Sequence, residues 1–368
     1  MSEPTLAAIT LDATGGGVAA VSRLIWSVMG ENWGDGRRLV ELTAGRTTGS
    51  EGSRPSLSSR ATFALRLGAL ELSRPDSWIF FSHLSLARAQ TILPRAARRP
   101  YAVFLHGIEA WRPLSDAERG VLRRASLRVA NSQYTANRVA LANPGLGPID
   151  TCPLSLAPDE LPDRGPGSAG DRRTVLLVGR MAAGERYKGH DALLEAWPRI
   201  AASVPDARLV FAGDGDDRAR LMQKARALGI GDRVAFPGFV PAEALGDLYR
   251  GASIFAMPSR GEGFGLVYLE AMAHGLPCIG SIHDAAREII EDDVTGYLVD
   301  QADARAIAAR IVHLLSDRAA RDRMGAAGRR RVDAHFAYSA FSRRLVDLIG
   351  RAIGAHEAAL APVSRALD

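Results

Sequence analysis

The chain has 368 residues, 47% of them hydrophobic and 24% charged, and its net charge at pH 7 is +5. This length predicts two or three domains with ordinary hydrophobic cores, and no run reaches the roughly 18 apolar residues that a transmembrane helix needs. The first residues carry no basic leader, so no secretory signal is expected. Cys152 and Cys278 are the only cysteines and lie in apolar runs. We therefore expect buried thiols in a reduced, cytoplasmic protein.

The excess of positive charge lies in the first 164 residues, where every basic residue is an arginine. Two clusters stand out, one at Arg95, Arg98 and Arg99 and the other between Arg119 and Arg128. Such clusters favour an anionic partner, for example an acidic membrane, although a solvated surface with no partner is an equally good interpretation. The sequence has no basic motif interleaved with aromatic residues, so no nucleic-acid partner is predicted.

The first half of the chain alternates strand and helix patterns. Residues 5–11 form a strand pattern that runs into the glycines at 15–17, and residues 18–28 have helical periodicity. Further strand patterns are RLVELT, SWIFFS, YAVFLH and LRVANS, each followed by a polar turn and a helical stretch. Residues 157–173 are rich in proline, glycine and charge, so they form the best linker in the sequence.

After this linker the alternation restarts with TVLLVGR, ARLVFAG, RVAFPG, SIFAMP, PCIG and GYLV. Short apolar strands alternating with helices predict parallel sheets that are covered on both faces. We predict an α/β protein of two Rossmann-like, doubly wound domains, at 1–165 and 166–335, with a C-terminal helix at 336–368 that packs back on the first domain. Ligands of such sheets bind beyond the carboxyl ends of the strands, so a shared ligand would lie in a cleft between the domains.

The segment EGFGLVYLEAMAHGLP, residues 262–277, carries the strongest functional signal. It follows a strand pattern and leads into a helix, whose free N–H groups and dipole suit a phosphate. Its two glycines let the backbone approach that ligand. The carboxylates of Glu262 and Glu270 would flank the phosphates and accept hydrogen bonds from sugar hydroxyls. The alternative is an exposed acid and a glutamate in the first turn of the helix, with no ligand.

This segment resembles family 4 of the retaining glycosyltransferases, the glycosyl transferases group 1, in which E-x(7)-E precedes AMA-x-G-x-P. The resemblance covers nearly all of residues 174–300. It implies the GT-B fold of two Rossmann-like domains facing across a cleft. It also implies that Glu262 contacts the donor sugar and Glu270 the ribose of the nucleotide. The backbone groups that it assigns to the diphosphate, the sugar and the base belong to Gly263, Phe264, Gly265, Leu266 and Val240.

Two cations border the turn after the strand TVLLV. Arg180 follows the strand and Lys188 precedes a helix, and Lys188 is one of only two lysines in the chain. Two cations at this place would neutralise a diphosphate and stabilise it as a leaving group. The G-R…K-G pair of the family implies the same role. A surface pair on an ordinary strand-to-helix connection is the alternative.

The sequence Asp214-Gly215-Asp216 has the form of a metal-binding D-x-D motif. However, Asp216 or Asp217 is well placed to act as the N-cap of the following helix. The family has a similar G-D-G turn with no metal, so the resemblance implies that none binds here.

In the first half, FLHGIEAW places His106 at the carboxyl end of a strand and resembles the H-G-x-E segment of the family. The resemblance implies that His106 contacts the donor sugar near the reacting carbon and that Gly16 approaches the donor phosphates. Glu109 is either a substrate contact or the cap of the next turn. Ser132 and Thr135 are either a helix-capping pair or contacts to the acceptor or a phosphate.

The resemblance implies a cytoplasmic, retaining hexosyltransferase that uses a UDP or GDP sugar, with no metal or cofactor and with the diphosphate oxygen as base. The acceptor would be a glycan, a lipid-linked or a small molecule, in bacterial surface polysaccharide or glycolipid assembly, with peripheral contact to an anionic membrane. The alternatives are a sugar-nucleotide epimerase of GT-B fold and a non-catalytic subunit that binds nucleotide sugars. The predicted catalytic residues are His106, Glu262, Arg180 and Lys188.

Overall fold

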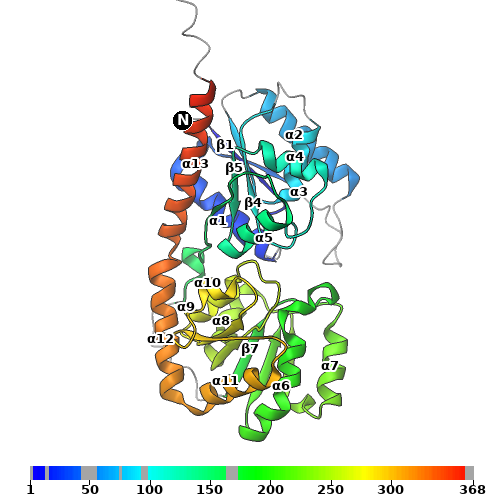
Figure 1. Cartoon of the computed structure of the whole chain (residues 1–368), viewed down its shortest axis with the longest axis vertical. Coiled ribbons are helices and arrows are strands. Elements are labelled where there is room, and N and C mark those ends of the chain that lie inside the picture. The colour runs from blue at the N-terminus through cyan, green and yellow to red at the C-terminus, as the bar shows by residue number, and fades with distance from the viewer. Residues whose placement is uncertain are drawn as a thin grey trace, which may run out of the picture. The chain divides into compact units, whose positions relative to one another are not determined.

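The computed structural model describes residues 3–12, 16–42, 56–73, 77–92, 98–162 and 173–360. The chain divides into two compact units (Figure 1). Unit 1 comprises Met1–Leu154 together with Ser339–Asp368, and unit 2 comprises Ser155–Tyr338. The first division thus falls ahead of the expected boundary at 165, and the second falls just after the expected boundary at 335.

Unit 1 contains a six-stranded parallel sheet in the order β2-β1-β3-β4-β5-β6. Figure 1 shows α1 and α13 on one side of this sheet and α2 to α4 on the other. Because helices cover both faces, strands such as β4 are buried along their whole length. The strands are β1 (Pro4–Ala8), β2 (Arg38–Glu41), β3 (Trp78–Phe81), β4 (Tyr101–Leu105), β5 (Leu127–Ala130) and β6 (Asp150–Thr151); the helices are α1 (Gly16–Trp33), η2 (Gly34–Gly36), α2 (Leu57–Ser73), α3 (Leu84–Ala87), η3 (Arg88–Thr91), α4 (Asp116–Arg124), α5 (Gln133–Ala142) and α13 (Tyr338–Leu360).

Unit 2 contains a second six-stranded parallel sheet, in the order β12-β11-β10-β7-β8-β9. Its strands are β7 (Thr174–Val178), β8 (Arg208–Ala212), β9 (Val234–Gly238), β10 (Ile254–Ala256), β11 (Cys278–Ser281) and β12 (Gly296–Val299); its helices are η5 (Pro158–Glu160), η6 (Ala183–Lys188), α6 (His190–Ser203), α7 (Arg218–Ala227), η7 (Gly231–Arg233), α8 (Ala242–Gly251), α9 (Leu266–Ala273), α10 (Ala286–Ile289), α11 (Ala304–Ser316) and α12 (Arg318–His335). The predicted class, two doubly wound parallel sheets, is confirmed. Of the strands in the described residues, the sequence pattern missed β6 alone, which has two residues and is too short to have a period.

The last helix, α13, belongs to unit 1 although it follows unit 2 in sequence. Phe341 and Leu345 are buried, and the Cys152 Sγ lies 4.0 Å from the carbonyl oxygen of Phe341. Arg351 lies 3.7 Å from Asp150 in an ion pair. The helix therefore contacts β6 and the residue that follows it. Both cysteines are buried and free, as expected.

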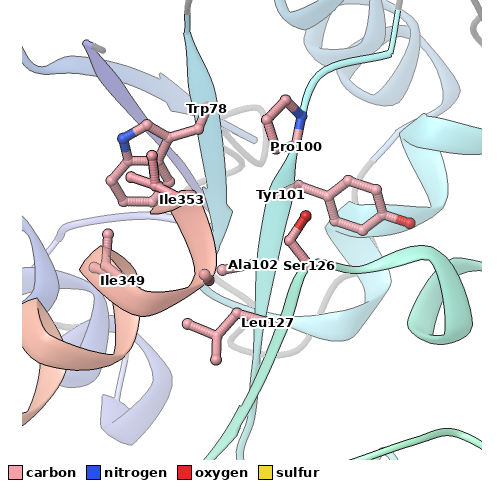
Figure 2. A pocket seen from close by; sticks show the side chains of 9 residues that line it. Trp78, Pro100, Tyr101, Ala102, Ser126, Leu127, Ile349 and Ile353 are labelled. Atoms are coloured by element: carbon pink, nitrogen blue, oxygen red, sulfur yellow. The ribbon is translucent and has the colours of Figure 1, made fainter. Parts of the chain in front are cut away.

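A small apolar hollow lies beside α13 at the amino ends of β3, β4 and β5, with about 20 Å³ of space open to the centre of a water molecule (Figure 2). Ligands of doubly wound sheets bind at the opposite, carboxyl ends of the strands. The hollow is therefore not a candidate for the phosphate site. Its lining residues are Trp78, Pro100, Tyr101, Ala102, Ser126, Leu127, Ile349, Ala352 and Ile353.

Candidate functional site

The strand order of unit 2 reverses between β7 and β10, which pair with each other. In doubly wound sheets the crevice at such a reversal is the usual ligand site, on the side of the carboxyl ends. Arg180 follows β7 there, the loop at 257–265 follows β10, and Val240 follows β9. The residues that the sequence predicted in this half thus lie along one edge of one sheet.

The loop between β10 and α9 requires glycine at Gly265. Its φ is +94°, and a Cβ there would lie 2.6 Å from the Tyr268 ring and 3.1 Å from the Cγ of Glu262. Phe264 is buried against Phe336, with the two ring centroids 6.0 Å apart. No side chain caps the first turn of α9, which lies wholly within the described residues. The N–H groups of this first turn are therefore suited to an anion, whereas those of Gly263 and Phe264 donate to the Glu262 carboxylate.

Glu262 is half-buried in the second half of this loop. Burial raises the pKa of its carboxyl above the ordinary value, and Lys188 lowers it, followed by smaller effects of Glu185 and of the adjacent backbone amides. The charge of Lys188 thus acts on this carboxyl through space. Glu262 and Lys188 lie in segments that follow the neighbouring strands β10 and β7.

The two predicted cations share a counter-ion, Glu185, which the sequence reasoning missed. Arg180 forms an ion pair with Glu185, and the Nζ of Lys188 lies 3.5 Å from the other carboxylate oxygen. The Arg180 side chain is 68% exposed, whereas that of Lys188 is 17% exposed and passes over Gly179. The sequence RMAAGERYK places an acid between the two cations, so this pairing could have been predicted from it. Of the two, Lys188 has the more fixed position.

The turn after β8 supports this site through two glycines. Gly213 and Gly215 have positive φ angles, and a Cβ on them would lie 2.1 Å from the carbonyl oxygen of Gly179 and 2.3 Å from that of Met181. The N–H of Met181 also donates to Asp214, at 2.9 Å. The G-D-G turn therefore packs directly against the backbone around Arg180, which explains its glycines without a metal.

The aspartates of this turn are engaged with protein groups. Asp216 accepts a hydrogen bond from the N–H of Ala183, at 2.8 Å. Asp217 occupies the N-cap position of α7, as predicted, but makes no capping hydrogen bond; its carboxylate pairs with Arg186 at 2.7 Å and Arg220 at 2.6 Å. The expected capping role is therefore wrong for its side chain. Among the described residues, no group of three His, Cys, Asp or Glu is placed to hold a metal.

Glu270 lies on α9 and is oriented by a tyrosine. The buried Tyr249 hydroxyl donates to its Oε2 at 2.6 Å, and the Tyr249 ring stacks on His274. Burial raises the pKa of Glu270 to about 7, although the Tyr249 hydrogen bond lowers it. The other oxygen, Oε1, has no hydrogen bond to a described residue that would compete with a sugar hydroxyl. Tyr249 has no motif of its own, so the sequence did not reveal this contact.

In unit 1, His106 follows β4 and interacts mainly with backbone. Its Nε2 lies 2.6 Å from the carbonyl oxygen of Ser82, its ring stacks on His83, and its N–H donates to the Glu109 carboxylate at 2.6 Å. Glu109 thus closes its own turn, which was the simpler of its two interpretations. Gly16 begins α1 with a φ of +68° and with no atom within 4 Å of a Cβ placed on it. The adjacent residue 15 lies outside the described residues.

The predicted pair at the start of α5 is buried. Ser132 is the N-cap, and its hydroxyl accepts from the N–H of Thr135 at 3.0 Å. Both side chains are fully buried. The capping interpretation is therefore confirmed for Ser132.

Comparison with known proteins identifies the family. Residues 161–331 match the family model for Glycosyl transferases group 1. A GDP-mannose-dependent alpha-(1-6)-phosphatidylinositol monomannoside mannosyltransferase of Mycolicibacterium smegmatis is 31% identical over 283 residues, 72% of this chain and 73% of that protein. The chain belongs to the glycosyl transferases group 1 family. It is a glycosyltransferase of a retaining hexosyltransferase family, as the resemblance implied.

Solved structures agree on the fold of this glycosyltransferase. Sucrose-phosphate synthase from Thermosynechococcus elongatus superposes with a TM-score of 0.79 at 22% identity, covering 96% of this chain and 100% of that one. HepE of Anabaena in complex with UDP-glucose gives 0.76 at 18% identity, with coverage of 95% and 99%. At these identities the likeness establishes the GT-B fold.

The arginine clusters of the glycosyltransferase have partly structural roles. Arg128 donates to the carbonyl oxygens of Leu122 and Ala125, at 2.7 and 2.8 Å, and so binds the carboxyl end of α4. Arg99 donates to the carbonyl oxygen of Glu71 at 2.9 Å. Arg95 lies outside the described residues. In the parts of the chain that the structure describes, no helix has the length and apolar character needed to span a bilayer.

Proposed function

We propose that this glycosyltransferase transfers mannose from GDP-mannose to a lipid-linked acceptor. The donor and the acceptor class are those in the name of the mycobacterial relative, which spans most of this chain. The observation that carries the proposal is the placement of Lys188 and Glu262 after β7 and β10, at the strand-order reversal of unit 2, where the charge of Lys188 lowers the pKa of the Glu262 carboxyl. A cation and a carboxylate at this position fit a ligand with both a phosphate and a sugar hydroxyl.

Each residue then has a distinct task. Lys188 and Arg180 would neutralise the diphosphate as the glycosidic bond breaks, and the amides at the start of α9 would add hydrogen bonds to the same group. Glu262 would accept hydrogen bonds from the sugar, and Glu270 from the ribose. Glu185 pairs with both cations in the free protein. The diphosphate would therefore have to replace it, in part, as their counter-ion.

His106 would contact the donor sugar from unit 1, and Gly16 would bring backbone to the donor phosphates. Both follow strands of the unit 1 sheet on the side of the carboxyl ends. The imidazole of His106 is held by the backbone carbonyl of Ser82, so its ring orientation is defined before any ligand binds.

A lipid-linked acceptor requires that the enzyme reach a membrane surface. The arginines of unit 1 would supply peripheral contact with anionic lipid, each worth about 1 kcal/mol near such a surface. Arg98 and Arg99 are the described members of the first cluster, and both are half-buried. Placement at the cytoplasmic face of a membrane is part of the same proposal.

The test begins with thermal unfolding in the presence of GDP-mannose, GDP-glucose, UDP-glucose and UDP-galactose. Stabilisation by GDP-mannose, followed by transfer of labelled mannose to liposomes containing phosphatidylinositol or its mannosides, would support the proposal. Transfer from a UDP sugar alone would overturn the donor assignment. Epimerisation of the donor without any acceptor, or binding without turnover, would contradict the transferase activity.

Two further experiments test the membrane contact and the metal-independent reaction. Flotation with anionic and neutral liposomes at low and high salt should show binding only to anionic vesicles at low salt, and no binding to either would contradict the membrane contact. Full activity in excess chelator is expected, and collapse of activity there would contradict the metal-independent reaction.

A further inference from the structure

Asp284 joins the loop that carries Glu262 to two other segments of unit 2. It follows β11, is 1% exposed, and was not among the residues predicted from sequence. Its Oδ2 accepts from the Ser259 hydroxyl at 2.5 Å and from the N–H of Glu262 at 3.1 Å. Its Oδ1 accepts from the N–H of Ala286 at 3.0 Å. One side chain therefore links the end of β10, the glutamate loop and the start of α10.

The backbone of Glu262 is held from both sides by the same segment. Its N–H donates to Asp284, and its carbonyl oxygen accepts from the N–H of Ala285 at 3.2 Å. Two hydrogen bonds to adjacent residues on one segment fix the peptide planes before and after Glu262. The Cα–Cβ direction of Glu262, and with it the approach of its carboxylate, is set by this pair of bonds.

We propose that Asp284 is a positioning residue that orients Glu262 for its contact with the donor sugar. The inference rests on the proposed function of Glu262. Asp284 acts through the backbone of the loop, and its carboxylate is fully occupied by donors from the protein.

The energetics favour a functional reason for this residue. A buried carboxylate loses its hydrogen bonds to water. Asp284 replaces them with hydrogen bonds from three protein donors. Burial raises its pKa to about 6, and the negative charge of Glu262 adds a smaller rise. A second carboxyl next to Glu262 is unfavourable for stability alone, because like charges destabilise each other.

The decisive variant is Asp284→Asn. The amide has nearly the same shape, but only one of its two terminal atoms accepts hydrogen bonds, so either Glu262 or Ala286 loses its acceptor. The Ser259 hydroxyl can rotate to accept, whereas a backbone N–H cannot. Ser259→Ala removes the hydroxyl and leaves the bond to the Glu262 backbone intact.

Asp303→Asn is the matched control. The carboxylate of Asp303 accepts from the N–H groups of Arg305 and Ala306, at 3.0 and 2.9 Å, at the start of α11. This variant removes the charge of a carboxylate that binds backbone N–H groups in unit 2, and it does not touch the glutamate loop. Both N–H groups donate to the same oxygen, Oδ1, which the amide retains. An effect of the lost charge alone should appear in both aspartate variants alike.

Three measurements are needed on each full-length variant: thermal unfolding, amide hydrogen exchange of residues 259–266, and steady-state transfer from GDP-mannose. For Asp284→Asn we expect faster exchange in this segment and a fall in kcat of about 10- to 100-fold, because small misplacements of a contact group have effects of this size. The affinity for GDP should stay within about twofold, since Glu270 and the cations are unchanged. Ser259→Ala and Asp303→Asn should keep the wild-type kcat.

Unchanged hydrogen exchange at 259–266 in Asp284→Asn, or a kcat equal to that of Asp303→Asn, would overturn the inference. If the wild-type protein transfers no sugar from any donor, the proposed function fails. The exchange experiment still decides, in that case, whether Asp284 holds the loop.

Discussion

The carboxyl edges of the two sheets are built in different ways. In unit 2 the charged side chains at the edge act on one another, since Glu185 pairs with two cations and Lys188 lowers the pKa of Glu262. In unit 1 the candidate residues mainly contact backbone, as His106 does with Ser82. When side chains interact with one another, substitution of one also disturbs the others. Substitution of a residue that contacts only backbone leaves the neighbouring side chains in place. Single substitutions should therefore cost more in unit 2 than in unit 1.

The largest effect should come from Glu262→Gln. The substitution keeps the shape of the side chain but removes its charge and weakens its hydrogen bonds to the sugar, so kcat should fall by roughly 100-fold or more. Steady-state transfer from GDP-mannose measures this. The unfolding temperature should not fall, because burial already disfavours the ionised carboxyl. A kcat within threefold of wild type would contradict the role of Glu262.

Next come the two cations, which should differ from each other. Lys188 is mostly buried and its charge acts on Glu262, so Lys188→Ala should reduce kcat by about 100-fold. Arg180 is largely exposed, and Arg180→Ala should reduce kcat by about tenfold. Parallel kinetics on the two variants provide the measurement. The reverse order would mean that the arginine leaves Glu185 and becomes the main contact of the diphosphate.

An effect no larger than that of Arg180→Ala is expected from His106→Ala in unit 1. Its ring contacts backbone and a neighbouring histidine, so few other groups should move when it is removed. We expect a loss in kcat/KM of about tenfold with unchanged affinity for GDP. Competition titration and transfer kinetics on one preparation test both statements. A loss as large as that of Glu262→Gln would break the contrast between the two sheet edges.

The smallest effect should be a pH dependence caused by Glu270. Its pKa of about 7 lies above the ordinary 4.5, so the carboxyl ionises as the pH rises through 7, and the ionised form accepts hydrogen bonds from ribose more strongly. Donor affinity should therefore rise a few-fold from pH 6 to 8. Glu270→Gln should flatten this profile. The Tyr249 hydrogen bond lowers the pKa of Glu270, so its removal in Tyr249→Phe should move the midpoint of the profile to higher pH.

The contribution of Glu270 to the free energy of unfolding changes with pH in the opposite direction to donor affinity. The unfolded chain loses the Glu270 proton near pH 4.5 and the folded protein near pH 7, so the folded state holds more protons between these values. This group stabilises the fold fully below pH 4.5, and its contribution falls as the pH rises to 7. Thermal unfolding of wild type and Glu270→Gln across this range should show the difference, and identical slopes would contradict the raised pKa.

The sequence predicted the fold because apolar strands alternating with helices have few other solutions than doubly wound sheets. It predicted the loop at 262–266 because the required chemistry is local: Gly265 must have a positive φ, and the helix N-terminus follows directly. Such features are visible in a few consecutive letters.

The groups that support this loop were not predictable in the same way. Asp284 contacts Glu262 across 22 residues of sequence, and Tyr249 contacts Glu270 across 21. Each pairing depends on which strands become neighbours in the sheet, and no local pattern states that. Glu185 was within reach, since it lies between the two cations that it binds.

Unit 1 is assembled from both ends of the chain, with α13 supplying buried residues such as Phe341 from beyond unit 2. During synthesis, the ribosome therefore makes every residue of unit 2 before it releases the helix that completes unit 1. Unit 2 is one continuous stretch of chain and can fold as such, whereas the core of unit 1 is incomplete until its last helix has been made. The strands of the sheet that His106 follows are all made first, but its helical cover is completed only after unit 2, which carries Glu262.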